Sequence, residues 1–98
     1  MRIRLSRRAA AELEYHFEVG VSRFGPLIAE RTFARVRHLI FDLLAANPEM
    51  GTYHPNRDIF ESIIAHTPFI IFYRSDGNGD ISIVAIFNQS QDRDWFED

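Results

Sequence analysis

The side chains of this sequence that could exchange a proton or hold a phosphate lie mainly in its second half. The candidates for acid–base work are two histidines, a glutamate and a tyrosine: His54, Glu61, His66 and Tyr73. The candidates for holding an anion are three arginines: Arg57, Arg74 and Arg93. A base, an acid and a cation are the groups that general acid–base catalysis on an anionic substrate requires. These residues raise the hypothesis that the protein is an enzyme that uses acid–base catalysis.

Four of these residues also have an ordinary structural explanation. His54 stands in a predicted loop, where a histidine is usually just exposed. Tyr73 ends a predicted buried strand and suits the edge of a core, and Arg57 and Arg74 suit solvated charges in a loop and at a strand end. Along the chain, no base stands with a cation and an acid in a recognisable motif. The sequence therefore assigns no catalytic residue, and the three arginines stay candidates.

Neither a metal site nor a cofactor is predicted. The histidines at positions 16, 38, 54 and 66 show no ligand spacing such as His-x-x-x-His, and the chain contains no Cys. Gly77 and Gly79 fall in a predicted hairpin loop, where turn geometry accounts for them. They do not form a phosphate-binding loop.

Length and composition predict a single folded domain over residues 1–98. Hydrophobic residues make up 46% and charged residues 26%, which is typical of a folded protein. The net charge is −3 and every basic residue is an arginine, a balance that argues against a protein built to hold phosphate backbones. No apolar run reaches the roughly 18 residues of a membrane span, and the first residues do not form a signal peptide. The absence of Cys is compatible with the cytoplasm.

Two amphipathic helices are predicted in the first half of the chain. Ser6 suits the N-cap of a helix over residues 7–23. A second helix is predicted over residues 26–46, with one apolar face: Ala29, Phe33, Val36, Ile40, Leu43 and Leu44. Gly25-Pro26 separates them, because Gly suits the position after a helix and Pro suits the first turn of the next. So short a linker predicts an antiparallel helical hairpin.

Four strands complete the predicted fold. Residues 2–6 alternate between apolar and charged side chains and form the first strand. After a loop over residues 47–57, three more strands follow at 59–65, 69–74 and 81–87. The unbroken apolar run at 69–73 predicts a central strand covered on both faces, and the short connections predict an antiparallel meander. The fold class is therefore α+β, two-layer, with the helical hairpin packed on an antiparallel sheet in the order β-α-α-β-β-β.

This order of elements resembles the RelE/ParE toxin family over essentially the whole chain, and its ParE-like branch most. Four segments carry the resemblance: a helix start with small and acidic residues (Ser6 to Leu13), Pro48-Glu49-Met50-Gly51, Phe72-Tyr73-Arg74, and a polar ending from Phe87 to Trp95. Their combination in this order is characteristic, although each one alone is common. The chain has Asn88 where many relatives have a histidine, and Glu61 where many have an arginine.

The resemblance implies the toxin of a type II toxin–antitoxin system. In the ParE branch the toxin poisons DNA gyrase and is silenced by a small ParD-like antitoxin, with which it forms a hetero-oligomer. The implied working surface is the C-terminal end: Arg74, Arg93, Asp94 and Trp95. Trp95 could instead fold back to cap the helical hairpin. An antitoxin tail is expected to fold into an apolar groove, for which Leu27, Leu39 and Phe41 are candidates unless they simply pack within the fold.

Two alternatives to gyrase poisoning stay open. The RelE branch cleaves messenger RNA on the ribosome, and in that case Arg57, Arg74 and Arg93 would be the catalytic candidates. The chain could also be an inactive relative that only binds an antitoxin. The acidic balance, Asn88 and Glu61 favour gyrase inhibition, which is a binding function and not an enzymatic one.

Overall fold

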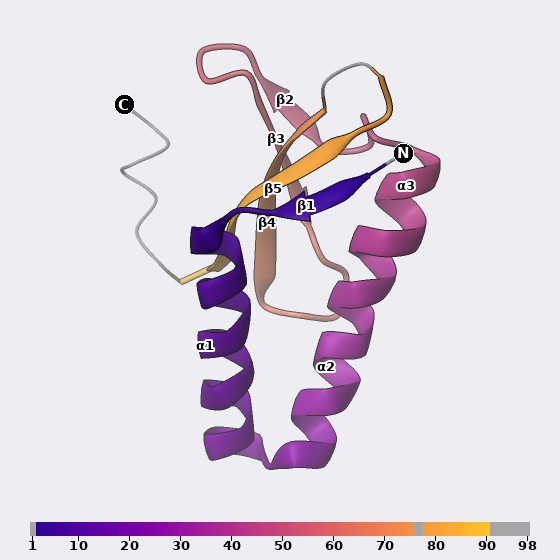
Figure 1. Cartoon of the computed structure of the whole chain (residues 1–98). Helices are drawn as coiled ribbons and strands as arrows, with labels where there is room; N and C mark the ends of the chain where they lie inside the picture. Colours follow the sequence, from indigo (N-terminus) through magenta and orange to yellow (C-terminus); the bar gives the residue numbers. More distant parts are fainter. Residues whose placement is uncertain (1, 76–77, 91–98) are drawn as a thin grey trace.

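The computed structural model describes residues 2–75 and 78–90 and has two layers (Figure 1). The helical elements are α1 (Arg7–Phe24), α2 (Pro26–His38), η1 (Leu39–Leu43) and α3 (Leu44–Ala46). The strands are β1 (Ile3–Leu5), β2 (Thr52–His54), β3 (Ile59–Ile63), β4 (Phe69–Ser75) and β5 (Ile81–Asn88). In Figure 1, α1 and α2 form a hairpin whose tip points away from the sheet. The α+β class with a helical hairpin beside a sheet is confirmed.

The sheet has the order β1-β5-β4-β3-β2. β2, β3, β4 and β5 pair antiparallel, which confirms the predicted meander. β1 pairs parallel with β5, so the sheet is mixed and not purely antiparallel as predicted. Two parallel strands need a long connection between them. Here α1, α2 and the other strands of the meander lie between β1 and β5 in the chain, so β1 can pair with β5 in the parallel sense.

The hairpin linker has the predicted geometry. Ser6 caps α1, because its Oγ accepts the Ala9 N–H at 2.9 Å. Gly25 ends α1 with a φ of 88°, in the left-handed region that glycine tolerates best. Pro26 then opens α2 at a position where its missing N–H costs nothing.

The predicted helix over residues 26–46 is helical throughout but contains one turn of π-helix. In η1 the N–H of Leu44 donates to the carbonyl of Leu39, five residues back. Ile40 and Leu44 are buried at 1% and 0% exposure, whereas Leu43 is 42% exposed. The prediction that Leu43 lies on the buried face was wrong, because the wider turn changes the helical period that the prediction assumed.

A short strand lies where the sequence predicted only loop. β2 pairs with β3 through Thr52↔Glu61, Tyr53↔Phe60 and His54↔Ile59. It has only three residues, Thr52–His54, which is too short to show the apolar alternation by which strands are recognised. Backbone groups make the pairing between β2 and β3, and the pattern of side chains in the sequence does not predict such a pairing. At its other end, β3 stops at Ile63, earlier than the predicted Ala65.

The core lies on both faces of the sheet. The larger cluster joins the helices to one face, through residues such as Phe33, Val36 and Ile71. A second cluster consists only of strand residues: Ile59, Ile70, Phe72, Ala85 and Phe87. Neighbouring residues of a strand point to opposite faces, and Phe69 to Tyr73 are all buried. This confirms the prediction that β4 is a central strand covered on both sides.

The outer edge of β5 is closed by side chains of α1. β1 reaches only as far as Ile83, which leaves the following backbone groups without a strand partner on that side. Ser6 Oγ donates to the Val84 carbonyl at 2.8 Å, and Glu12 Oε1 accepts the Ile86 N–H at 2.9 Å. His16 Nε2 lies 3.1 Å from the Ile86 carbonyl. A carbonyl only accepts, so this nitrogen carries the hydrogen. The three side chains thus continue the ladder that β1 begins.

Replacing Glu12 with alanine is expected to lower the free energy of unfolding by about 2 kcal/mol, because a buried backbone N–H loses a charged acceptor. Glu14→Ala is the matched control, since Glu14 is exposed on the same helix. Urea denaturation followed by circular dichroism measures both. Equal stability of the two variants would show that the Glu12 bond does not hold α1 to β5.

Candidate functional site at the corner of β2, β3 and β4

Three of the predicted chemistry-bearing residues meet on one face of the sheet. His54 pairs with Ile59, and the β3–β4 register, continued one residue beyond Phe60↔Tyr73, places Arg74 opposite Ile59. Residues directly opposite across strands share a face, and so do residues two apart in one strand. His54, Glu61 and Arg74 therefore lie on the same face at this corner. The sequence alone did not group them, because the register of β2 was not predicted.

His54 and Glu61 form a hydrogen-bonded pair. Nε2 of His54 lies 3.0 Å from Oε1 of Glu61, and their side chains are 35% and 17% exposed. A carboxylate oxygen accepts, so Nε2 is the donor in this pair. A carboxylate that orients an imidazole in this way is the arrangement found behind many general bases.

Arg74 is bonded to the backbone of the β2–β3 turn. Its Nε donates to the Asp58 carbonyl at 3.1 Å, and its Nη2 donates to the Arg57 carbonyl at 3.3 Å. Asp58 has a φ of 50°, which is uncommon for a residue other than glycine. The Asp58 carboxylate also accepts the Tyr53 hydroxyl at 2.8 Å. Arg74 therefore holds a tight turn in place, and this turn carries the second candidate cation, Arg57.

On the other face of the corner, the two central motifs are joined by one hydrogen bond. The Gly51 N–H donates to Oη of Tyr73 at 3.0 Å. A Cβ at Gly51 would lie 2.7 Å from the Glu61 carbonyl oxygen and 2.9 Å from the Tyr73 hydroxyl. Only glycine fits this approach. The Phe60 ring stacks on Tyr73, with centroids 5.2 Å apart. The Pro-x-x-Gly and Tyr-Arg segments are thus parts of a single structural unit.

The tyrosines of the corner stay protonated at neutral pH. Burial raises the pKa of Tyr73, the bond from Gly51 lowers it, and the charge of Glu49 raises it. The hydrogen bond to the Asp58 carboxylate raises the pKa of Tyr53, with smaller contributions from desolvation and from the same charge. Tyr73 is the hydrogen-bond acceptor of Gly51 and not a base.

The remaining candidates do not join this corner. His66 lies in the turn between β3 and β4, at the far end of β4 from Arg74, with a φ of 63°. Asn88 pairs with Phe69 at that same far end. Arg93, Asp94 and Trp95 lie outside the described residues. Within the described ranges, no three carboxylates or histidines gather as metal ligands.

The pairing of His54 with Glu61 was missed by sequence analysis, although a signal for it exists. Pro55-Asn56-Arg57-Asp58 has the composition of a turn between two strands. A hairpin closed there pairs the residues on either side. The candidate residues fall within reach of each other once that hairpin is assumed.

The molecule is thus a small α+β domain in which a Pro-x-x-Gly turn is bonded to a Tyr-Arg strand beside a helical hairpin. The chain belongs to the family described as the ParE toxin of the type II toxin–antitoxin system, parDE, whose model matches residues 3–93.

Among solved structures, the chain is similar to one titled "Chromosomal ParDE TA system from P. aeruginosa", with a TM-score of 0.69 and 23% sequence identity. The match covers 90% of this chain and 95% of that chain. At this identity the similarity supports the fold. No match was found among curated proteins. None of the helices in the described ranges combines the length and apolar character that crossing a bilayer needs.

Tyr73→Phe removes the acceptor of the Gly51 N–H and is expected to lower the free energy of unfolding by about 1–2 kcal/mol at pH 8. The raised pKa of Tyr73 gives the wild type stability that is fully present below the unfolded tyrosine pKa of about 10 and is lost as the pH rises above it. The phenylalanine variant lacks this contribution. The stability gap should therefore narrow above pH 10, as measured by urea denaturation across pH 8–11. A gap that does not change with pH would contradict this role of Tyr73.

Proposed function

We propose that the chain arrests bacterial growth by binding and poisoning DNA gyrase, and that a cognate ParD-like antitoxin silences it in a hetero-oligomer. The observation that carries the proposal is the bonding of Arg74. Its guanidinium donates to two backbone carbonyls, so the most central candidate cation serves the fold. Arg74 is nevertheless an exposed residue, and a guanidinium that the backbone holds in place suits a contact with a partner protein.

The charge of the molecule supports binding to a protein. The net charge is −3, and on the face that carries His54 and Glu61 the neighbouring strand positions are apolar, as with Phe72 and Phe87. An enzyme that seats on ribosomal RNA needs a basic surface beside its reacting groups, because phosphate contacts supply much of the affinity.

The same face does carry arginines: Arg4 and Arg74 both lie opposite Ser82, and the Arg8 guanidinium lies 5.0 Å from the centre of the Phe87 ring. The proposal therefore rests on the net charge of the whole chain and not on an absence of basic groups from this face.

The proposed working surface begins at Arg74 and extends to Arg93, Asp94 and Trp95, which lie outside the described residues. A tryptophan preceded by an arginine and an aspartate has the composition of a protein-binding anchor. The proposal treats residues 1–98 as one domain acting in the cytoplasm, where gyrase is found.

The His54–Glu61 pair favours one second candidate function, ribosome-dependent cleavage of messenger RNA. Glu61 orients the imidazole at 3.0 Å, and Arg57 lies in the adjoining turn. In that case His54 would take the 2′-hydroxyl proton and an arginine would hold the phosphate.

The two candidates are separated by measuring both activities with the purified protein. We expect gyrase supercoiling of plasmid DNA to fall and cleaved DNA to accumulate, while a reporter message in a reconstituted translation reaction stays intact. Cleaved message with unaffected supercoiling would overturn the proposal. Normal growth of bacteria that express the folded chain alone would show an inactive relative.

His54→Ala gives an independent test in growing cells. Loss of a general base costs roughly 10²- to 10⁴-fold in rate, so a nuclease would lose its toxicity. A gyrase poison is expected to keep it, because His54 then only pairs with Glu61. Circular dichroism of the variant provides the folding control.

A further inference from the structure

Two arginines and a serine lie in one row across three strands, on the face of the sheet that carries His54 and Glu61. Arg4 of β1 and Arg74 of β4 both pair with Ser82 of β5, the strand between them. Paired residues of neighbouring strands share a face, and all three residues are exposed. Strands lie about 4.8 Å apart, so the Cα atoms of the two arginines are about 10 Å apart, with a hydroxyl between them. We call these three residues the arginine row.

The Arg4 guanidinium is available to a ligand. Ile3 and Leu5 pack against the core, so Arg4 between them projects from the opposite face of the sheet. The ion pairs among the described residues engage Arg8 and Arg37 and leave Arg4 without a carboxylate. A guanidinium carries five N–H donors in a planar fork that matches the oxygens of a phosphate or a carboxylate.

Arg74 is held in place but keeps donors for a ligand. Its Nε and Nη2 donate to the carbonyls of Asp58 and Arg57. These two bonds use only part of the five N–H groups, and those of Nη1 remain for another acceptor. Because the two carbonyls already order the side chain, a ligand loses less free energy in immobilising it.

Two carboxylates near the arginine row are bonded to other groups. Asp80, two residues before Ser82, accepts the backbone N–H of Arg2 at 2.9 Å. Glu61 lies 3.0 Å from Nε2 of His54. Neither carboxylate forms an ion pair with the arginines of the row, so the row keeps its positive charge in a chain whose net charge is −3.

Protection of a sheet edge explains only part of this arrangement. A charge on an edge strand hinders pairing with another chain, and this role suits Arg4 because β1 is an edge of the sheet. It does not account for Arg74 or Ser82, which lie on inner strands. It also does not explain the register that places both arginines opposite the same serine.

We propose that the arginine row binds a phosphate of the DNA backbone, with one guanidinium on either side and the Ser82 hydroxyl beneath it. The inference rests on the proposed function, in which the toxin acts on gyrase while that enzyme holds DNA. A phosphate presents oxygens in several directions and can accept from all three side chains at once, whereas a carboxylate has two oxygens in one plane. Because a phosphate contact positions DNA without reading its sequence, this contact is expected to be independent of sequence.

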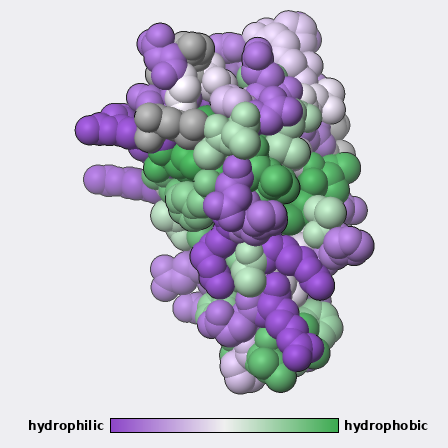
Figure 2. Space-filling view, turned by 90° about the vertical axis from the view of Figure 1, so that its right-hand side faces the viewer, coloured by the Kyte–Doolittle hydropathy of each residue, from purple (hydrophilic) through white to green (hydrophobic). Residues whose placement is uncertain are grey.

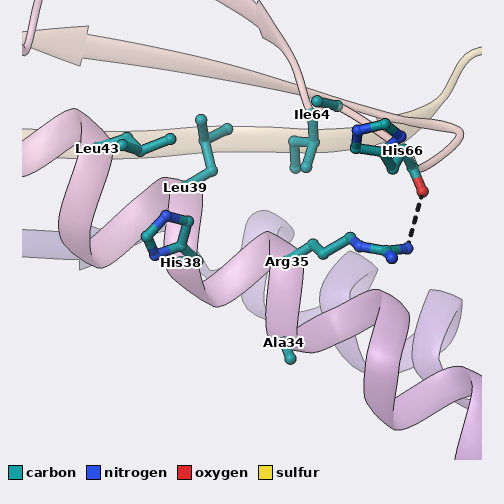
Figure 3. A pocket seen from close by; sticks show the side chains of 8 residues that line it. Ala34, Arg35, His38, Leu39, Leu43, Ile64 and His66 are labelled. Carbon is teal, nitrogen blue, oxygen red and sulfur yellow. Dashed lines mark hydrogen bonds between the residues drawn. The ribbon is translucent and has the colours of Figure 1, made fainter.

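An arginine on another surface provides the control. Figure 2 views the molecule from the α2 side and shows apolar surface gathered in a band across its middle. On α2, Arg35 is exposed and donates to the His66 carbonyl at 3.4 Å, beside a cavity of about 350 Å³ (Figure 3). His66 precedes β4, whereas Arg74 lies near its other end. Arg35 therefore has the charge of Arg4 without its place in the row.

The first test is an NMR titration of the isotope-labelled full chain with a short DNA duplex. We expect the largest chemical-shift changes at the amides of Arg4, Arg74 and Ser82. For one neutralised phosphate, the affinity should fall about 3.5-fold as NaCl is raised from 50 to 200 mM. Arg4→Ala should weaken binding roughly tenfold, because a charge-assisted contact is lost, and Arg35→Ala should bind as the wild type does.

Three outcomes of this titration would overturn the assignment. The first is the absence of shifts at the row, or equal affinity of Arg4→Ala and the wild type. The second is equally tight binding of inorganic phosphate, which would show recognition of a free anion and not of a backbone. The third is tighter binding of a single-stranded RNA of the same sequence. Circular dichroism controls for folding, and Ser82→Ala, which removes only a hydroxyl, decides if Arg4→Ala unfolds.

A gyrase cleavage assay keeps this inference distinct from the proposed function. If the wild type makes cleaved DNA accumulate, Arg4→Ala should need roughly tenfold more protein for the same effect, and Arg35→Ala should not. Equal potency of Arg4→Ala and the wild type would mean that the row is wrong while gyrase poisoning stands. If the wild type leaves gyrase unaffected but the duplex still shifts the amides of the row, the proposed function fails and the phosphate site stands.

Discussion

The fold depends on closing the outer edge of β5. β1 supplies partners only as far as Ile83. Beyond it, the N-cap Ser6 and two side chains of α1, Glu12 and His16, bond to the backbone of β5. The register of β5 against β4 is irregular at Phe72/Tyr73, so that Val84 is the additional residue of β5 at the point where β1 ends. The bonds that complete the pairing of β5 are therefore the same bonds that attach α1 to the sheet. The same bonds that protect the edge hold α1, and with it the helical hairpin, at a set position along the sheet.

The corner of β2, β3 and β4 follows from β4 being fixed in the centre. Phe69 to Tyr73 are buried on both faces, so the strand cannot slide without exposing large side chains. Its end then presents Tyr73 to Gly51 on one face and Arg74 to the β2–β3 turn on the other. The motifs by which the family is recognised in sequence are in this molecule the bonds that attach β2 and its turn to the sheet. The Pro-x-x-Gly and Tyr-Arg motifs therefore have a role in the fold, whether or not they also have a role in activity.

The features that were predictable are those that repeat along the chain. The spacing of apolar side chains predicts both helices and the buried strand β4, because burial of one face requires a regular pattern. The residues Gly25-Pro26 predict the break between the helices. The features that were missed are made by backbone groups or by register. β2 has no apolar alternation, the π turn has no side-chain signature, and the His54–Glu61 pair exists only because β2 lies beside β3. Arg74 was named as a catalytic and partner-binding candidate, and the sequence could not show that its guanidinium donates to two backbone carbonyls.

The two ends of β4 are held apart by the strand itself. Five residue steps from Phe69 to Arg74 span roughly 17 Å at a strand's rise of about 3.3 Å per residue. β4 is packed on both faces, so the turn that carries His66 stays at one end while the corner that carries His54 and Glu61 stays at the other. Any chemistry at this corner must therefore use the residues that β2, β3 and the end of β4 bring together, and cannot draw on His66 or Asn88.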